Sequence, residues 1–319
     1  MNTKFVETFL QLAEVKSVRQ VARQMHTTPG TVSMRIKKLE EQVGVTLFNW
    51  NHKTLEITPK GAQLISYAQA IMEATEAFKN ASSTKTHTSK LRLGVNESIV
   101  LTVLPKIMRF LERLIPGIQI DLSVDLTTNL KERLILRELD IIMHVSGDQT
   151  ATPFFSSYDI LEFPQHWISK PRSLGVDQPL DQLLSKQFIT QMRGTVPYEL
   201  ALDTLRQLSE KYGLPASDIR VSGSPSLAAM ISLVKGGIGI GIMPAILVKK
   251  ELLEGELIEL NHPTIPATKV SLSHMRNASP AICSTADLIN KICAHYCRKE
   301  SRHYIRFVGD KSAIQYKPY

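Results

Sequence analysis

Apolar positions at helical spacing mark three short segments at the start of the chain. The pattern i, i+3, i+4, i+7 runs from Val6 to Ala13 and returns in 18–25 and 32–43. Ser17 is placed to cap the second helix, Thr28 followed by Pro29 to begin the third, and Gly44 to end it. Two residues, His26 and Thr27, separate the second and third helices, which predicts the tight junction of a helix-turn-helix.

The next pattern predicts a small β-hairpin followed by a longer helix. Residues 45–61 hold two short apolar runs on either side of Asn49–Thr54, which is typical of a wing. From Gly61 a seven-residue rhythm indicates a helix that pairs with a second copy of itself. Its apolar positions are Leu64, Ala68, Ile71, Thr75 and Phe78. The small polar run 81–90 then predicts a hinge.

Beyond residue 90 strands and helices alternate. Strands are expected at 91–95, 118–124 and 140–145, with helices at 104–111 and 130–138 between them. A second set has strands at 188–190, 219–222 and 238–242, with helices at 198–212 and 226–235; 268–275 and 281–297 close the fold. This βαβαβ order predicts an α/β protein with parallel sheets. Residues 298–319 are basic and aromatic, without a clear pattern.

Composition adds the contrast between a basic head and a near-neutral body. The chain has 319 residues and a formal net charge of +8, and residues 1–90 alone hold 12 Lys and Arg against 7 Asp and Glu. A basic head predicts a module that faces a polyanion, although scattered solvated charge explains the same numbers. The N-terminus does not have the pattern of a signal peptide, no apolar run of about 18 residues predicts a membrane span, and three cysteines suit a reducing cytoplasm.

The helix-turn-helix pattern favours DNA binding, because such a motif presents the N-terminus of its second helix to the major groove. An ordinary three-helix bundle with a solvated basic face is the alternative at this point. The residues expected near base edges or phosphates are Thr27, Thr28, Pro29, Gly30, Thr31, Ser33, Met34, Arg35, Lys37, Lys38 and, in the wing, Lys53.

The run SVRQVARQMHTTPGTVSMRIKKLEEQVGVTLFNWNHKTLEITPKG resembles the DNA-binding region of LysR-type transcriptional regulators. The resemblance continues through LPKIMRFLERLIPGIQIDL, LKERLILRELDIIM and LVKGGIGIGIMPAILVKKELLEGELIEL, to about residue 297. It implies a winged helix-turn-helix (1–61), a linker helix and hinge (62–90) and a two-lobed effector domain like periplasmic binding proteins (91–297), before a basic tail (298–319). Lobe I would hold about 91–160 and 265–297, and lobe II about 161–264.

The family resemblance also implies partners and an effector site. Such regulators bind double-stranded promoter DNA as homodimers or homotetramers, respond to a small ligand between the lobes, and have RNA polymerase as a further partner. Hydroxyls and free N–H groups at helix starts favour a polar anion, while Glu97 leaves an amino-acid-like effector open. The expected effector residues are Asn96, Ser98, Thr127, Thr128, His144, Thr190, Gln191, Arg193 and Ser226.

The sequence departs from the family pattern at three places, and three other signals in it carry no function. The Gln-Pro pair that family members commonly carry at the start of the recognition helix is absent, and Met34 and Trp50 stand where basic residues are frequent, which predicts more weight on apolar contact and DNA shape. GGIGIG lacks the context of a phosphate loop, Cys293-x-His295-x-Cys297 does not form a metal site, and no catalytic grouping stands out. We therefore expect no enzyme activity, cofactor or metal. The rivals are a solute-binding protein and an enzyme with a DNA-binding head.

Overall fold

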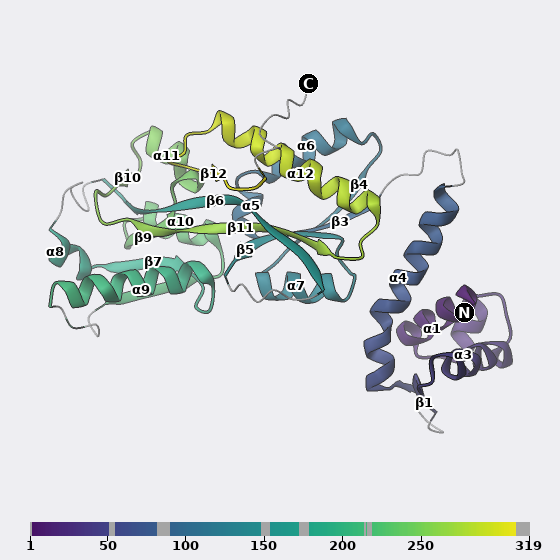
Figure 1. The fold of residues 1–319 in the computed structure, drawn as a ribbon. Coiled ribbons are helices and arrows are strands. Elements are labelled where there is room, and N and C mark those ends of the chain that lie inside the picture. Colours follow the sequence, from purple (N-terminus) through teal and green to yellow (C-terminus); the bar gives the residue numbers. More distant parts are fainter. Residues whose placement is uncertain are drawn as a thin grey trace. The chain divides into compact units, whose positions relative to one another are not determined.

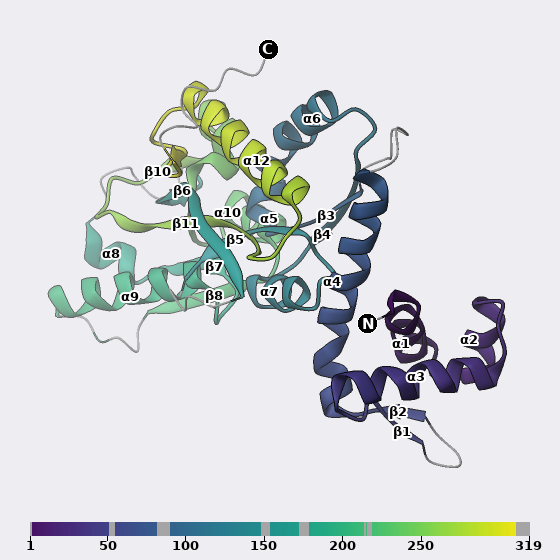
Figure 2. The same cartoon turned by 45° about the vertical axis from the view of Figure 1, so that its right-hand side comes forward.

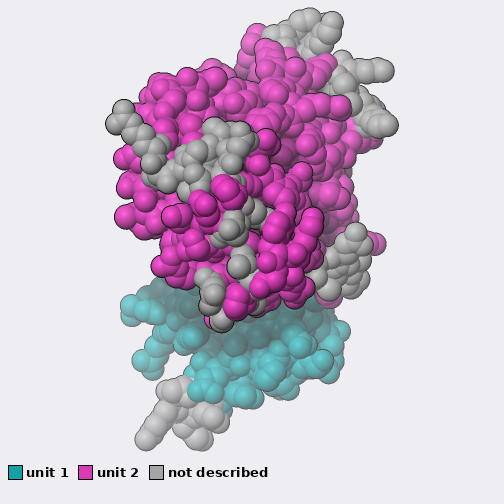
Figure 3. All heavy atoms as spheres, turned by 90° about the vertical axis from the view of Figure 1, so that its left-hand side faces the viewer, with its two compact units in different colours: residues 1–88, 132–138 teal, residues 89–131, 139–319 magenta. Residues whose placement is uncertain are grey.

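A computed structural model describes residues 2–50, 55–81, 90–147, 154–171, 179–213, 215 and 219–310. The chain divides into two compact units, residues 1–88 with 132–138 and residues 89–131 with 139–319 (Figure 3). None of the described helices is long and apolar enough to cross a membrane.

The first unit is a winged helix-turn-helix (Figure 2). Its elements are α1 (Thr3–Val15), α2 (Val18–Gln24), α3 (Pro29–Val43), β1 (Phe48–Trp50), β2 (Leu55–Ile57) and α4 (Pro59–Ala81). All three expected helices and the antiparallel wing are confirmed, and α4 begins two residues before Gly61. The expected caps are also confirmed: Ser17 and Thr28 accept backbone N–H groups, and Gly44 ends α3 in the left-handed conformation.

One apolar cluster holds this unit together. Phe9 of α1 and Phe48 of β1 meet edge to face at 5.7 Å, and both are fully buried. Leu64, Ala68 and Ile71 of α4 pack into the same cluster. Three of the apolar residues that predicted a dimerising helix therefore pack within a single chain.

The second unit is built on a mixed sheet (Figure 1). Its first elements are β3 (Lys90–Val95), α5 (Glu97–Val100), α6 (Leu104–Leu114), β4 (Gln119–Val124), α7 (Thr127–Ile135, of which 127–131 belong to this unit), β5 (Ile141–Ser146), β6 (Phe155–Ser169), α8 (Leu180–Leu184), β7 (Gln187–Gln191) and α9 (Val196–Lys211). There follow β8 (Arg220–Ser224), α10 (Leu227–Lys235), β9 (Ile240–Pro244), the 3-10 turn η2 (Ala245–Val248), α11 (Lys249–Leu253), β10 (Ile258–Glu259), β11 (Ile265–Met275), α12 (Pro280–Lys299) and β12 (Arg306–Phe307).

The strand order β4-β3-β5-β11-β6-β9-β7-β8 explains the two lobes. β3 pairs in parallel with β4 and β5, and β7 pairs in parallel with β8 and β9, so both predicted βαβαβ patterns are confirmed. The long antiparallel strands β6 and β11 run between them. β11 pairs with β5 on one side and β6 pairs with β9 on the other, so these two strands join lobe I to lobe II.

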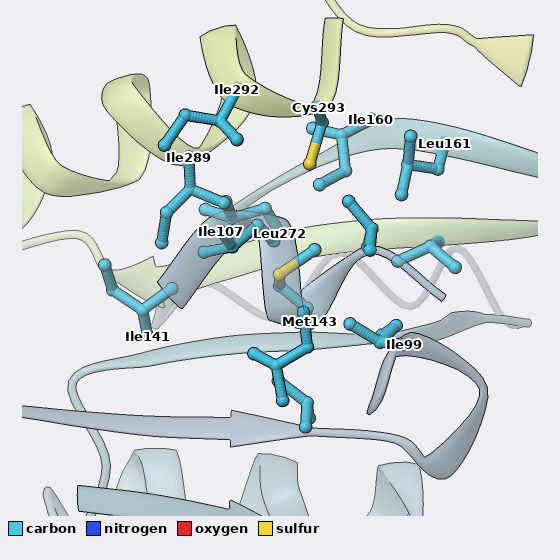
Figure 4. Close-up of a cluster of buried hydrophobic side chains, with 14 of the residues drawn as sticks. Ile99, Ile107, Ile141, Met143, Ile160, Leu161, Leu272, Ile289, Ile292 and Cys293 are labelled. Carbon is cyan, nitrogen blue, oxygen red and sulfur yellow. The ribbon is translucent and has the colours of Figure 1, made fainter. Parts of the chain in front are cut away.

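Each lobe has its own apolar packing. In lobe I, side chains of β3, β5, β6, β11, α6 and α12 form one buried cluster, part of which is drawn in Figure 4. Ile289, Ile292 and Cys293 of α12 point down onto Ile160 and Leu272 of the sheet (Figure 4). In lobe II the clusters around Trp167 and Ile168 pack helices α9 and α10 against β7 and β9. These packed clusters support the loops at the strand ends of each lobe.

The C-terminal segment packs on the second unit as far as the structure describes it. α12 extends to Lys299, β12 pairs with β6, and Ile305 is fully buried in the lobe I cluster. Sequence alone left DNA affinity, packing and disorder open for this tail. Within 298–310 the tail packs through Ile305 and β12, and residues 311–319 lie outside the described residues.

Candidate DNA-binding face and effector cavity

Helix α3 presents one exposed face from its first turn. Gly30, Met34 and Lys37 follow one another at helical spacing and are exposed, with Met34 46% accessible. Ser33 lies on the same face, half-buried, and its hydroxyl donates to the Pro29 carbonyl at 3.2 Å. Val32, Ile36 and Leu39 on the opposite face are buried. The helix thus buries one stripe and leaves a small, weakly polar stripe facing outward.

Hydroxyl groups organise the start of α3. The Thr31 backbone N–H donates to Thr28 Oγ1 at 3.2 Å, and the two hydroxyls lie 2.9 Å apart. Pro29 at the first helical position has no N–H to satisfy. The first turn is therefore well defined, and its remaining N–H groups form a positive helix end of the kind that binds phosphate.

Two of the expected DNA-contact residues, Arg35 and Lys53, are not part of the exposed face that the structure describes. The Arg35 guanidinium donates to Thr8 Oγ1 of α1 at 3.3 Å, so this side chain reaches back into the unit. Lys53 lies outside the described residues. Thr27, Thr28, Thr31 and Lys38 flank the exposed stripe, and Thr28 and Lys38 are exposed.

A carboxylate that the sequence did not single out fixes the wing to α3. Glu40 Oε1 accepts the backbone N–H groups of Leu47 at 2.7 Å and Phe48 at 3.2 Å. Thr58 Oγ1 donates to the Thr46 carbonyl at 2.7 Å and accepts the Gly61 N–H at 2.9 Å. These bonds hold both ends of the wing against helices α3 and α4.

A cavity of about 690 Å³ lies among loops from both lobes of the second unit. That volume suits a small organic ligand. Its lining comes from the ends of β3, β4, β5, β7 and β8 and the starts of the elements that follow them, and consists of Asn96, Glu97, Ser98, Val124, Asp125, Leu126, Thr127, Thr128, Lys131, Val145, Gly147, Gln191, Met192, Gly194, Thr195, Val196, Pro197, Ser224, Pro225 and Leu227.

Asn96 ties three strand ends together on the lobe I side. Its Oδ1 accepts the Val145 N–H at 2.6 Å and the Thr127 hydroxyl at 3.2 Å. Its Nδ2 donates to the Asp125 carbonyl at 2.7 Å. Because these bonds use both lone pairs of Oδ1 and one of the two Nδ2 N–H groups, Asn96 shapes the cavity and keeps a single donor for a ligand.

Both acidic side chains of the cavity are also engaged. Glu97 Oε2 accepts the Leu227 N–H of α10 at 2.9 Å, a bond that runs from lobe I to lobe II. Asp125 Oδ1 accepts the Leu126 N–H at 2.7 Å and the Asn129 amide at 2.8 Å. Their negative charges are thus partly compensated by helix-start donors.

Two lining groups are available to a ligand. Ser98 is 5% exposed, and its hydroxyl has no hydrogen-bond partner among the described residues. Leaving such a group unpaired costs about 1–3 kcal/mol, which a ligand can recover. Lys131 has no ion pair with any other residue in the described ranges, so its ammonium is free to pair with an anion.

Five expected effector residues come together in the cavity and four do not. Asn96, Ser98, Thr127, Thr128 and Gln191 line it. His144, Thr190, Arg193 and Ser226 are not among its lining residues. His144 and Thr190 lie within strands β5 and β7 and are buried, and Ser226 caps α10 by accepting the Ala229 N–H at 3.3 Å.

The environment of His144 explains why it belongs to the core. Its Nδ1 lies 3.2 Å from the Val145 carbonyl, and its Nε2 lies 2.9 Å from Ser273 Oγ, which in turn lies 2.7 Å from Ser157 Oγ. Burial lowers the pKa of His144 to about 4, so the ring is neutral near pH 7. The geometry gives no support to an effector contact through His144.

Sequence reasoning missed Lys131 and most of the apolar lining. Lys131 lies one helical turn after Thr127 on α7, so the i, i+4 rule could have placed it beside the cavity. The apolar wall, which includes Leu126, Val196 and Leu227, carries no local chemical signal.

Known proteins match the chain in both units. Residues 4–62 match the family described as bacterial regulatory helix-turn-helix protein, lysR family. Residues 85–292 match the LysR substrate binding domain. A curated relative from Mycobacterium avium, a probable hydrogen peroxide-inducible genes activator, is 26% identical over 246 residues, which is 75% of this chain and 76% of the relative.

Solved structures show the same fold. ArgP from Mycobacterium tuberculosis superposes with a TM-score of 0.70 at 17% identity, covering 91% of this chain and 96% of that one. Full-length LysG from Corynebacterium glutamicum with bound effector Arg gives a TM-score of 0.69 at 19% identity, covering 92% and 99%. The substrate binding domain match alone spans most of the chain. The chain therefore belongs to the LysR family of transcriptional regulators, with a helix-turn-helix DNA-binding domain and an effector-binding domain.

Proposed function

We propose that α3 reads promoter DNA with the exposed stripe formed by Gly30, Ser33, Met34 and Lys37. The supporting observation is that this stripe begins at a capped, well-defined helix N-terminus, where the small residues Gly30 and Ser33 let the helix approach base edges. Lys37 supplies a phosphate contact. The residues that flank the stripe are Thr27, Thr28, Pro29, Thr31 and Lys38. Arg35 acts mainly within the unit through Thr8, and Lys53 in the wing remains a proposed phosphate contact.

A mobility-shift assay tests this proposal on the full chain. We expect the DNA upstream of the protein's own gene to be bound in the presence of excess scrambled competitor. Met34→Glu should abolish the shift, because a carboxylate on the exposed stripe repels phosphate. Glu254→Gln, at an exposed ion pair in the second unit, serves as the matched control. Binding by Met34→Glu that equals wild type would refute this face.

We further propose that the effector is a small carboxylate with an apolar portion. Support for this chemistry comes from the apolar wall of the cavity and from Lys131 and the Ser98 hydroxyl, which have no ion pair and no hydrogen-bond partner, respectively, among the described residues. Thr127, Thr128 and Gln191 add polar contacts around the same volume. An amino-acid-like effector fits less well, because Glu97 and Asp125 are already bonded to N–H groups.

Thermal shift with a panel of carboxylates and amino acids tests the effector class. Ligands that raise the melting temperature of the full chain should fail to do so in Lys131→Met. Lys250→Met is the matched control, because Lys250 lies on α11 and its side chain is 79% exposed. No stabilising ligand in the panel, or equal stabilisation of Lys131→Met, would contradict the proposal.

We also propose that the protein works in the cytoplasm as a homodimer or homotetramer, with RNA polymerase as a further partner. Support for self-association is an apolar hollow of the first unit lined by α1, α3 and α4, at which Val43 and Tyr67 are 38% and 59% exposed. Light scattering on a size-exclusion column should give an oligomer for wild type and a smaller species for Tyr67→Asp.

Peroxide sensing through Cys293 or Cys297 of α12, suggested by the name of one relative, lacks support in the environments of these two thiols. Burial raises the pKa of Cys293 well above its usual value and, with Glu300 nearby, the pKa of Cys297 to about 12. The thiolate is the reactive form, so these two thiols react slowly with oxidants.

A further inference from the structure

Two histidines and a glutamate from three distant segments meet in lobe II. His166 lies on β6, Glu259 on β10 and His303 in the turn that follows α12. β10 pairs with β6, with Glu259 opposite Ile168, and this pairing brings the first two side chains together. The segment after α12 then places His303 beside them. None of these residues lines the effector cavity or belongs to the DNA-binding unit.

The glutamate lies between the two imidazole rings. Glu259 Oε1 is in close contact with His166 Nδ1, and Glu259 Oε2 lies 2.8 Å from His303 Nε2. The ring centroids of the two histidines are 4.3 Å apart. One ligand atom from each residue lies within 4.8 Å of the other two. Adjacent ligands of a tetrahedral ion with bonds of about 2.0–2.1 Å are separated by roughly 3.3 Å, so the three groups are close to a coordinating arrangement.

The second nitrogen of His166 shows that a positive charge belongs in this cluster. His166 Nε2 lies 3.1 Å from the backbone carbonyl of His303, which can only accept a hydrogen bond. The Nε2 atom must therefore carry a proton. In a neutral ring Nδ1 would then present its lone pair to the Glu259 carboxylate, and two acceptors would face each other. A second proton or a metal cation between Nδ1 and the carboxylate removes that conflict.

We propose that His166, Glu259 and His303 bind a divalent transition metal ion of the zinc class. Imidazole nitrogens and a carboxylate oxygen are ligands that Zn²⁺ prefers in proteins. The His303 carbonyl orients the His166 ring from behind, as outer groups do for histidine ligands in metal sites. Three protein ligands leave a fourth position, which water can occupy because the His303 side chain is 45% exposed.

Such an ion would attach the C-terminal segment to lobe II. Next to His303, Tyr304 lies under the Lys249 ammonium at 5.2 Å, and Glu300 pairs with Lys249 at 2.6 Å. Ile305 is fully buried and β12 pairs with β6. The metal would therefore join strands β6 and β10 of lobe II to the segment that runs back into lobe I. Binding of the ion should stabilise the folded chain by an amount that grows with the logarithm of the ratio of free ion concentration to Kd.

Equilibrium dialysis of the chelator-treated full chain against Zn²⁺, with metal analysis, tests the proposal. We expect one Zn²⁺ per wild-type chain and weakening by at least about 100-fold in Glu259→Gln and in His303→Gln, since even outer-shell changes cost 10- to 100-fold. His303→Gln is safe for folding because the side chain is half-exposed. Circular dichroism should confirm that both variants fold.

Two controls separate this site from the thiols of α12. Cys297→Ser and His295→Gln should each keep one Zn²⁺ per chain. Co²⁺ bound to the wild type should show visible absorption without the near-ultraviolet band of a thiolate ligand. Retention of tight stoichiometric binding by Glu259→Gln and His303→Gln, loss of binding in Cys297→Ser, or absence of Zn²⁺ binding by wild type would each overturn the assignment.

Discussion

Acid should destabilise the second unit through His144, and the hydrogen-bond chain around the ring explains why. With a proton on Nδ1, the ring donates to the Val145 carbonyl and accepts at Nε2 from the Ser273 hydroxyl. Ser273 can in turn accept from Ser157, at 2.7 Å. A proton on Nε2 would reverse this order in a site where His144 is 2% exposed and Ser273 fully buried.

The shifted pKa sets the size of the effect. Burial, with a smaller contribution from the Lys131 charge, outweighs the Val145 carbonyl and Asp159, and lowers the pKa of His144 from 6.5 to about 4. Each pKa unit corresponds to about 1.4 kcal/mol, so the neutral ring contributes on the order of 3 kcal/mol of stability relative to the charged ring. Because the folded-state pKa is the lower one, this stability is complete above pH 6.5 and is lost as the pH falls from 6.5 towards 4.

Urea unfolding at a series of pH values measures this effect. The chain has two tryptophans, and Trp50→Phe leaves Trp167, 2% exposed in lobe II, as the reporter of the second unit. In that background His144→Gln should flatten the fall in unfolding free energy between pH 6.5 and pH 4.5. His26→Gln, at an exposed histidine of the other unit, is the control and should leave the slope unchanged. A slope as steep in His144→Gln as in its parent would refute the argument.

Three further substitutions test contacts that hold the wing to α3 and α4 and that link lobe I to lobe II. Gly61→Ala should destabilise the first unit by about 1–3 kcal/mol in urea unfolding, because a Cβ there would overlap the Leu47 carbonyl; an unchanged midpoint would contradict this contact. Glu40→Ala should cost about 2 kcal/mol in the same assay by removing the acceptor of two wing N–H groups, and a stability equal to wild type would exclude that role. Glu97→Ala should raise the affinity of any carboxylate found by thermal shift several-fold, because it removes a negative charge and frees the Leu227 N–H; calorimetry showing weaker binding would refute it.

Local rules accounted for most elements and failed where a segment serves both lobes. Periodicity located α1 to α4 because each helix packs an apolar stripe into one cluster, and the expected caps gave the start of α2 and both ends of α3. The strand β6 (Phe155–Ser169) was missed, because Asp159, Glu162 and Pro164 interrupt its apolar pattern. Antiparallel pairing with β11 keeps this segment extended. Local sequence could not predict that pairing, because β11 lies far along the chain from β6.

Local sequence rules also located some of the site residues and missed those that depend on long-range packing. Ser98 and Thr128 lie in the first turns of α5 and α7, the helices that follow β3 and β4 at one edge of the sheet, and both line the cavity. His144 lies inside β5, a strand buried on both faces, so its polar side chain marks a satisfied core position. The cluster of His166, Glu259 and His303 spans separations of 93 and 44 residues, far beyond any motif spacing.

The salt dependence of DNA binding tests most directly whether the exposed stripe of α3 meets the duplex. Fluorescence anisotropy with labelled upstream DNA should give a linear fall of log affinity with log salt for the full chain. Lys37→Ala should reduce that slope by about one unit, whereas Lys250→Ala should leave it unchanged. A Lys37→Ala slope equal to wild type, with binding retained, would contradict the proposed docking of α3.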